Sequence, residues 1–134
     1  ILTPHPKEFE RLTGEAENDY HRLELLRTFC STHSCYIVLK GRYTCTCTPS
    51  GSLYFNTTGN PGMATGGTGD VLTGIITALV AQNYSPAVAC LLGVYLHGLS
   101  GDLAARAKGE TALIASDIIN YLGKAFKQAA GTTA

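Results

Sequence analysis

A glycine-rich segment, residues 60–74 with the sequence NPGMATGGTGDVLTG, most strongly limits how this chain can fold. It contains five glycines, and its one acidic residue, Asp70, stands where a helical pattern of apolar residues begins. Because glycine adopts left-handed backbone conformations and lets main chains approach closely, such a segment favours turns over the interior of a helix or strand. The segment therefore predicts a turn that delivers Asp70 into the first turn of a helix.

The elements on either side of this segment indicate a mixed α/β fold. Before it, the pattern predicts a strand end at residues 1–6, helices over 7–14 and 20–31, a buried strand within 35–41 and a hairpin over 43–56. After it, the pattern predicts helices from Asp70 to about residue 83, from Pro86 through a central apolar stretch, and from Ser116 onward. The strands are too few for a complete doubly wound sheet, so we expect residues 1–134 to be the C-terminal part of a larger α/β domain.

Composition excludes several classes of protein. The 134 residues are 45% apolar and 15% charged, which is typical of a chain with a packed core. Ten acidic and ten basic residues cancel, so no basic surface for nucleic acid or an anionic membrane is expected. The apolar runs are interrupted before they reach membrane-spanning length, and no signal peptide is visible. Five cysteines without paired spacing predict reduced, largely buried thiols in a cytosolic protein.

Two common phosphate-binding motifs fail on this segment. Gly62 and Gly67 have the separation of a P-loop, but Thr68 stands where that motif requires lysine. Gly67 and Gly69 begin a dinucleotide fingerprint, but Leu72 occupies the position of its third glycine. Neither label therefore applies.

A helix N-terminus with flexible backbone before it can still bind an anion, because its first N–H groups have no partner within the helix. The backbone of Gly66, Gly67, Thr68 and Gly69 is predicted to form such an anion hole. Asp70 at its rim has two interpretations. It either complements the helix dipole, as many first-turn acids do, or removes a proton from a substrate hydroxyl beside the bound phosphate.

Other polar residues near strand ends are weaker candidates. Lys40, Arg42 and Thr44 follow the buried strand and either contact a nucleotide or form a solvated strand end. His5 lies between two prolines, which suits a substrate contact or an ordinary surface histidine. His97 is interpreted as a hydrogen-bonded histidine of the core or of a helix end, and Lys7, Glu8 and Glu10 are interpreted as a solvated helix start.

Five segments in order resemble a known family: TPHPKEFERL, VLKG, GNPGMATGGTGDVLTGII, GVYLHGLSGDLAA and LIASDII. They closely resemble the C-terminal half of the NAD(P)H-hydrate dehydratase domain, which is the carbohydrate-kinase-like YjeF C-terminal family. The resemblance covers nearly the whole chain, and NPGMATGGTGD is far more specific than a bare glycine motif. It implies the ribokinase-like fold, a three-layer αβα sandwich of which this chain is the C-terminal part.

The resemblance also implies an activity, a hydro-lyase reaction that repairs hydrated NADH and NADPH with ADP or ATP. The nucleotide phosphorylates the ring hydroxyl, and phosphate then leaves to restore the double bond. Mg²⁺ is implied as the companion of the phosphates. The resemblance further implies a cytoplasmic enzyme, with room for homo-oligomers and for an epimerase domain fused upstream. By matching positions it assigns the hydrated dinucleotide to His5 and Asp70, and the adenine nucleotide to Lys40, Gly41, Arg42, Tyr43, Thr44 and Gly69.

One departure and one alternative accompany the resemblance. The family's usual HPGE turn reads HPKE here, with Lys7 in place of glycine. A small-molecule kinase of the same fold, acting on a vitamin precursor or a sugar, is the alternative that the GTGD core alone would permit. A third, non-enzymatic interpretation is a fragment that only binds nucleotide or that packs as half of an assembly. The flanking NPGMA and TPHPKE favour the dehydratase.

Overall fold

The computed structural model describes residues 1–131 of the chain. The chain divides into two compact units, Ile1–Asn56 and Thr57–Ala134, and each unit is described by itself. The boundary falls just before the glycine-rich segment. The first unit therefore holds the described strands, and the second unit is helical.

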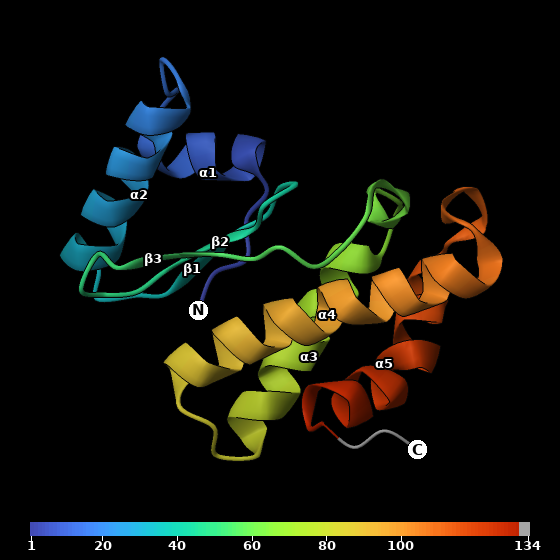
Figure 1. Ribbon diagram of the computed structural model, residues 1–134. Coiled ribbons are helices and arrows are strands. Elements are labelled where there is room, and N and C mark those ends of the chain that lie inside the picture. Colours follow the sequence, from blue (N-terminus) through green and yellow to red (C-terminus); the bar gives the residue numbers. More distant parts are fainter. Residues whose placement is uncertain (132–134) are drawn as a thin grey trace. The chain divides into compact units, whose positions relative to one another are not determined.

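The first unit has two helices and a three-stranded sheet (Figure 1). The strands pair antiparallel in the order β1-β2-β3, with Val38 opposite Thr46 and Thr46 opposite Tyr54. The hairpin predicted for residues 43–56 is confirmed as β2–β3. Because β1 also pairs antiparallel with β2, residues 40–44 form a second hairpin loop. The elements are α1 (Pro6–Thr13), α2 (Asp19–Thr32), β1 (Ile37–Leu39), β2 (Cys45–Cys47) and β3 (Leu53–Phe55).

The N-terminal residues run parallel to β1, as the predicted strand end requires. Leu2 forms a parallel bridge with Ile37, and the Val38 N–H donates to the Leu2 carbonyl at 2.8 Å. The Lys40 N–H then donates to the carbonyl of Pro4 at 2.9 Å. Because the N-terminal residues and β1 run parallel, their carboxyl ends lie at the same edge of the sheet. The residues that follow Leu2 and those that follow Leu39 therefore lie together.

The core of the first unit contains three of the cysteines. Cys30, Cys45 and Cys47 are buried beside Phe9 and Leu26, which come from α1 and α2. The Cys30 thiol donates to the Cys47 carbonyl and the Cys47 thiol to the Leu26 carbonyl, each at 3.8 Å. Burial raises the pKa of Cys45 to about 11, which keeps this thiol protonated. All five cysteines are free and four of them are buried, which confirms the prediction of largely buried cysteines.

The second unit is a helical assembly in which α4 packs against both α3 and α5 (Figure 1). The three helices predicted after the glycine-rich segment are confirmed, but α3 begins at Thr68, two residues before Asp70. The earlier start follows from the backbone of Gly67, which takes a left-handed conformation and ends the preceding turn there. The elements are η1 (Pro61–Met63), α3 (Thr68–Ala81), α4 (Pro86–Lys108), η2 (Glu110–Ala112) and α5 (Ala115–Ala129).

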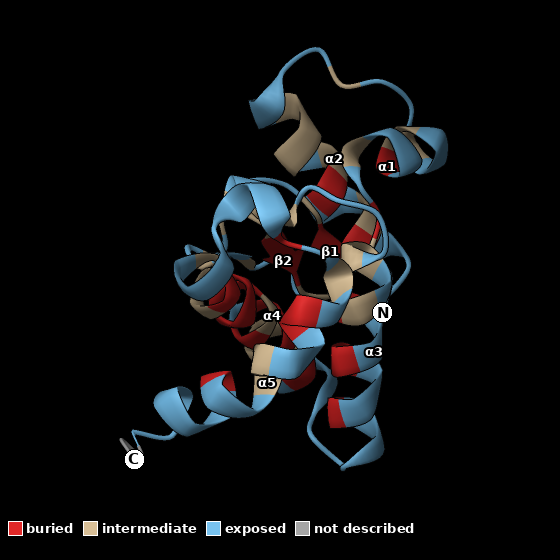
Figure 2. Cartoon of the chain, turned by 90° about the vertical axis from the view of Figure 1, so that its right-hand side faces the viewer, coloured by how far each residue is buried: buried red, intermediate tan, exposed pale blue. Residues whose placement is uncertain are grey.

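Helix α4 corrects one sequence expectation. Among the described residues it is the one helix long and apolar enough, by length and composition alone, to cross a membrane, with a mean hydropathy of 1.4 in its best window. The prediction that glycine and histidine interrupt the apolar run before this length is wrong. Gly98, Gly101 and His97 lie within the helix, and the mean hydropathy stays at 1.4 with them included. Of that window 56% is buried inside the structure, and Figure 2 shows buried residues in red along α4. The predicted role of a central, buried helix is confirmed.

Candidate functional site

The N-terminus of α3 presents uncapped backbone donors. Gly67 is the N-cap residue, with φ 85° and ψ −13°, and no side chain caps this helix end. Thr68, Gly69 and Asp70 form the first turn, and the earliest intrahelical bond runs from the Val71 N–H to the Gly67 carbonyl at 3.1 Å. The first-turn N–H groups therefore have neither a partner within the helix nor a side-chain cap, which is the condition that anion binding at a helix N-terminus requires. Asp70 is exposed at its rim.

His97 holds the first residue of this helix. Its Nε2 lies 2.9 Å from the carbonyl oxygen of Thr68. A carbonyl only accepts, so Nε2 carries the hydrogen and donates. Burial lowers the pKa of His97 below its ordinary value, while the hydrogen bond to Thr68 opposes the shift, and the ring is therefore neutral near pH 7. The prediction of a hydrogen-bonded histidine is confirmed, and its partner belongs to the glycine-rich segment.

Asp102 lies in this region and is not among the site residues predicted from the sequence. From α4 its carboxylate accepts from the Gly59 N–H and from the Asn60 side-chain amide, both at 2.9 Å. A shallow cleft of about 270 Å³ opens beside this contact, lined by Asn60, Asp102, Ala105, Arg106 and Glu110. Asp102 and Asn60 are 42 residues apart, and no periodicity within a single helix connects them. The one available signal was the SGD triplet within the segment GVYLHGLSGDLAA, to which no role was assigned.

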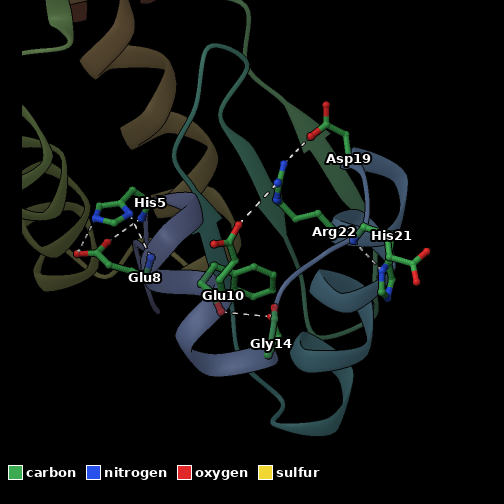
Figure 3. A network of polar contacts seen from close by, with 10 residues as sticks. His5, Glu8, Glu10, Gly14, Asp19, His21 and Arg22 are labelled. Atoms are coloured by element: carbon green, nitrogen blue, oxygen red, sulfur yellow. Dashed lines mark hydrogen bonds and ion pairs between the residues drawn. The ribbon is translucent and has the colours of Figure 1, made fainter.

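The first unit brings His5 and Lys40 together through Glu8. Figure 3 shows the His5 side chain beside that of Glu8. The His5 N–H donates to Glu8 Oε2 at 2.7 Å, and the Glu8 N–H donates to His5 Nδ1 at 3.1 Å. Lys40 Nζ lies 3.7 Å from Glu8 Oε2. His5 Nδ1 accepts in this arrangement, so Nε2 of the neutral ring carries the hydrogen, and it lies 3.5 Å from Glu8 Oε1. We call His5, Glu8 and Lys40 the N-terminal cluster.

Glu8 is exposed in the first turn of α1, so the prediction of a solvated helix start is confirmed, but Glu8 also has specific partners. Its carboxylate is half exposed, yet it caps α1 reciprocally with His5 and pairs with Lys40. The His5 N–H, followed by the positive charge of Lys40, holds the pKa of Glu8 below its ordinary value. Lys7 lies within α1, and it is absent from the described non-glycine residues with positive φ, which are Ser34 and Asn83. Replacing the family's glycine with Lys7 therefore causes no backbone strain.

The loop after β1 presents the other predicted nucleotide contacts. Gly41, Arg42 and Tyr43 are exposed, and the Thr44 hydroxyl donates to the Gly41 carbonyl at 3.2 Å. The Arg42 guanidinium carbon lies 5.3 Å from the centre of the Tyr43 ring, within cation–π range. The predicted site residues thus form two groups. The N-terminal cluster and this loop belong to the first unit, and the residues predicted to form the anion hole belong with Asp70 to the second.

The capping role of Glu8 gives a testable acid dependence. A lowered pKa in the folded state means that the stabilisation is present above the ordinary Glu pKa of about 4.5 and is lost as pH falls through the folded pKa. We expect amide hydrogen exchange in α1 to accelerate below that pH in the native protein. Glu8→Gln keeps an oxygen that can accept from His5 but carries no charge. It should therefore show a flatter pH dependence, whereas Glu8→Ala should exchange fast at every pH. An unchanged pH dependence in Glu8→Gln would contradict the assignment.

Comparison with known proteins places the chain in a family. The family model described as NAD(P)H-hydrate dehydratase matches residues 1–124. A bifunctional NAD(P)H-hydrate repair enzyme of Moorella thermoacetica is 48% identical over 124 residues, which are 91% of this chain and 23% of that protein. An ADP-dependent (S)-NAD(P)H-hydrate dehydratase of Bacillus subtilis is 38% identical over 130 residues. These are 96% of this chain and 47% of that protein, so the chain spans from just under a quarter to just under half of these relatives.

Solved structures agree with the sequence comparison. A Bacillus subtilis ADP/ATP-dependent NAD(P)H-hydrate dehydratase co-crystallised with ATP and Mg²⁺ and soaked with CoA has a TM-score of 0.88 at 36% identity. The match covers 96% of this chain and 48% of that one. A ribokinase-like superfamily protein of Enterococcus faecalis has a TM-score of 0.75 at 34% identity and covers 96% of this chain and 44% of that one. The predicted ribokinase-like α/β fold is confirmed, and the chain belongs to the NAD(P)H-hydrate dehydratase family.

Proposed function

We propose that the protein containing this chain dehydrates hydrated NADH and NADPH at the expense of ADP or ATP. Residues 1–134 are proposed to be the C-terminal part of a single ribokinase-like domain. The observation that carries the proposal is the uncapped N-terminus of α3 with the exposed Asp70 at its rim. An anion-binding helix end beside a carboxylate suits phosphoryl transfer to a hydroxyl. The helix end stabilises the negative charge of the phosphoryl group, and the carboxylate removes the proton of the hydroxyl.

In the proposed reaction, Asp70 accepts the proton of the hydroxyl on the hydrated nicotinamide ring. The hydroxyl oxygen bonds to the terminal phosphorus of the nucleotide, and the bridging P–O bond breaks with its electrons on the departing nucleotide. The C–O bond of the phosphorylated ring then breaks, phosphate leaves, and a proton lost from the neighbouring ring carbon restores the double bond. The backbone N–H groups of Gly66, Gly67, Thr68 and Gly69 stabilise the negative charge on the transferring group.

The first unit supplies the proposed binding contacts. His5 is proposed to contact the hydrated dinucleotide through Nε2, which carries the ring hydrogen. Lys40, Gly41, Arg42, Tyr43 and Thr44 are proposed to contact the adenine nucleotide, for which Lys40 and Arg42 supply positive charge. In this proposal Glu8 orients both His5 and Lys40.

Mg²⁺ is compatible with these residues as a companion of the nucleotide phosphates. Such ions are commonly bound by substrate phosphates, water and one or two carboxylates rather than by a dedicated protein cage. Within the described residues no cluster of three or more His, Cys, Asp or Glu side chains is suited to a metal ion. Asp70 is the carboxylate beside the anion hole. When bound, Mg²⁺ would neutralise charge on the phosphates.

The test is recovery of NADH from its hydrate. The full-length protein incubated with hydrated NADH and ATP, and separately with ADP, should restore the near-ultraviolet absorbance of NADH and release one phosphate per NADH formed. A reaction without nucleotide is the control. Accumulation of a stable phosphorylated product without release of phosphate would instead indicate the small-molecule kinase. If the folded protein restored no NADH absorbance with either nucleotide, the proposed dehydratase activity would be rejected.

The cytoplasm is the proposed location, consistent with the nature of the substrate. An epimerase domain fused to the same chain is proposed on the basis of the relatives named as bifunctional repair enzymes. Homo-oligomer formation is also proposed. Size-exclusion chromatography with light scattering on the full-length protein measures the number of subunits.

A further inference from the structure

The beginning of the glycine-rich segment is bound to α4 by two hydrogen bonds, which are linked to a third within the segment. Asp102 Oδ2 accepts from the Gly59 N–H at 2.9 Å, and Asp102 Oδ1 accepts from Asn60 Nδ2 at 2.9 Å. Asn60 Oδ1 in turn accepts from the Gly62 N–H at 3.1 Å, which caps η1. Only one orientation of the Asn60 amide satisfies both of its partners. We call this arrangement the Asp102–Asn60 clasp.

Glycines of α4 let the same stretch lie directly on the helix. A Cβ at Gly98 would stand 2.2 Å from the Thr58 hydroxyl and 2.7 Å from the Thr58 carbonyl, closer than real atoms approach. A Cβ at Gly101 would stand 2.2 Å from the Met63 sulfur. Residues 58–63 therefore follow the surface of α4 without intervening space, and the clasp lies within that contact.

The same helix, α4, also binds the segment at Thr68, where α3 begins. His97 Nε2 binds the carbonyl of Thr68 at 2.9 Å, immediately before Gly69 and Asp70. His97 and Asp102 thus fix the two ends of residues 59–68 to a single rigid element. Between these ends lie Gly66 and Gly67, whose backbones are intrinsically the freest of the stretch.

We infer that Asp102 is a positioning residue that, through Asn60, sets the geometry of the anion hole and of Asp70. The inference rests on the proposed function. Preorganised donors stabilise a transition state only when they are held within about 0.5 Å of the productive position, and a glycine-rich segment cannot hold itself so closely. The three hydrogen bonds of the clasp supply the constraint that the local sequence lacks.

Exchanging the two side chains gives a sharp test, because the exchange restores every hydrogen bond that each single change breaks. In Asp102→Asn the new amide faces the amide of Asn60, and turning Asn60 to relieve this would direct its nitrogen at the Gly62 N–H. In Asn60→Asp two carboxylates face one another with no proton between them. In the double variant, Asn at 102 accepts from Gly59 and donates to Asp at 60, which still accepts from Gly62.

The expected result in the full-length protein is a double-mutant cycle with strong coupling. Each single variant should lower kcat with hydrated NADH and ATP by about 10- to 100-fold, the scale expected for a displaced catalytic segment. KM for ATP should change far less, because the contacts proposed for residues 40–44 are untouched. The double variant should recover most of the native kcat. Arg106→Gln, at the exposed rim of the cleft, is the matched control and should keep native kcat.

Glycine amide resonances separate failure of this inference from failure of the proposed function. With nitrogen-labelled glycine, the signals of Gly66, Gly67 and Gly69 should shift in both single variants and return in the double variant, whether or not the protein is a dehydratase. Native glycine signals in the single variants would overturn the inference. The inference would also be overturned if the double variant folded but its kcat were no higher than that of the slower single variant. If the native protein had no dehydratase activity but the variants showed the expected shifts, the proposed function alone would be rejected.

Discussion

Asp70→Asn is expected to lower kcat of the full-length enzyme by about 10²- to 10⁴-fold, the usual contribution of a general base. The amide has the size of the carboxylate but does not accept the hydroxyl proton at neutral pH. Nucleotide affinity should be retained, because the backbone donors of the anion hole are unchanged and one negative charge near the phosphates has been removed. Stopped-flow absorbance of NADH formation measures kcat, and calorimetry with ATP measures binding.

A matched first-turn acid provides the control for Asp70. Asp19 occupies the first turn of α2 and is exposed, and it has no place in the proposed chemistry. Asp19→Asn should therefore keep native kcat. If Asp70→Asn turned over as fast as Asp19→Asn, Asp70 would be a helix-dipole residue like many first-turn acids, and the base would have to be sought elsewhere.

Gly98→Ala is expected to have the largest effect on stability, because its methyl group would collide with main-chain atoms that cannot rotate away. The new Cβ would stand 2.7 Å from both the carbonyl carbon and the carbonyl oxygen of Thr58. Overpacking of this kind costs about 1–3 kcal/mol or more, against a gain of about 0.5–1 kcal/mol for replacing a helical glycine with alanine. The free energy of unfolding should therefore fall, and kcat should fall with it, because residues 58–63 must move off α4.

Gly123→Ala in α5 is the control for that effect. Gly123 is exposed and helical, and a Cβ there meets no atom within 4 Å. The same substitution should raise the free energy of unfolding by about 0.5–1 kcal/mol. Denaturant unfolding of the two variants should thus give changes of opposite sign. Equal changes would mean that the close approach of residue 58 to α4 is absent in solution.

The sequence predicted the elements well because each carries its own period and its own end signals. The strand Ile37–Leu39, the hairpin after it and the helix from Pro86 all lie where apolar pattern, turn residues and proline indicated. The start of α3 was placed two residues late, since a glycine N-cap has no side chain to mark it. Local pattern is therefore sufficient for the α-helices and strands, but it does not predict the short 3-10 helices η1 and η2.

The contacts that shape the candidate site were less accessible to prediction. Glu8 has the composition of a solvated helix start, and its link to Lys40 depends on the parallel bridge between Leu2 and Ile37. Asp102 meets Asn60 only after α4 has packed against the glycine-rich segment. Motif resemblance predicts which groups react, whereas the contacts of the neighbouring residues depend on tertiary structure.

The burial of α4 has a consequence for the order in which the chain is made. Synthesis proceeds from the N-terminus, so all of α4 leaves the ribosome before α5, whose Leu122 and Ala125 cover Leu92, Leu96 and Leu99. During that interval an apolar helix of 23 residues has no partner on this side. A product that stops near residue 110 would keep that surface exposed permanently, so shortened versions of this protein should aggregate or recruit chaperones even though every proposed catalytic residue is present.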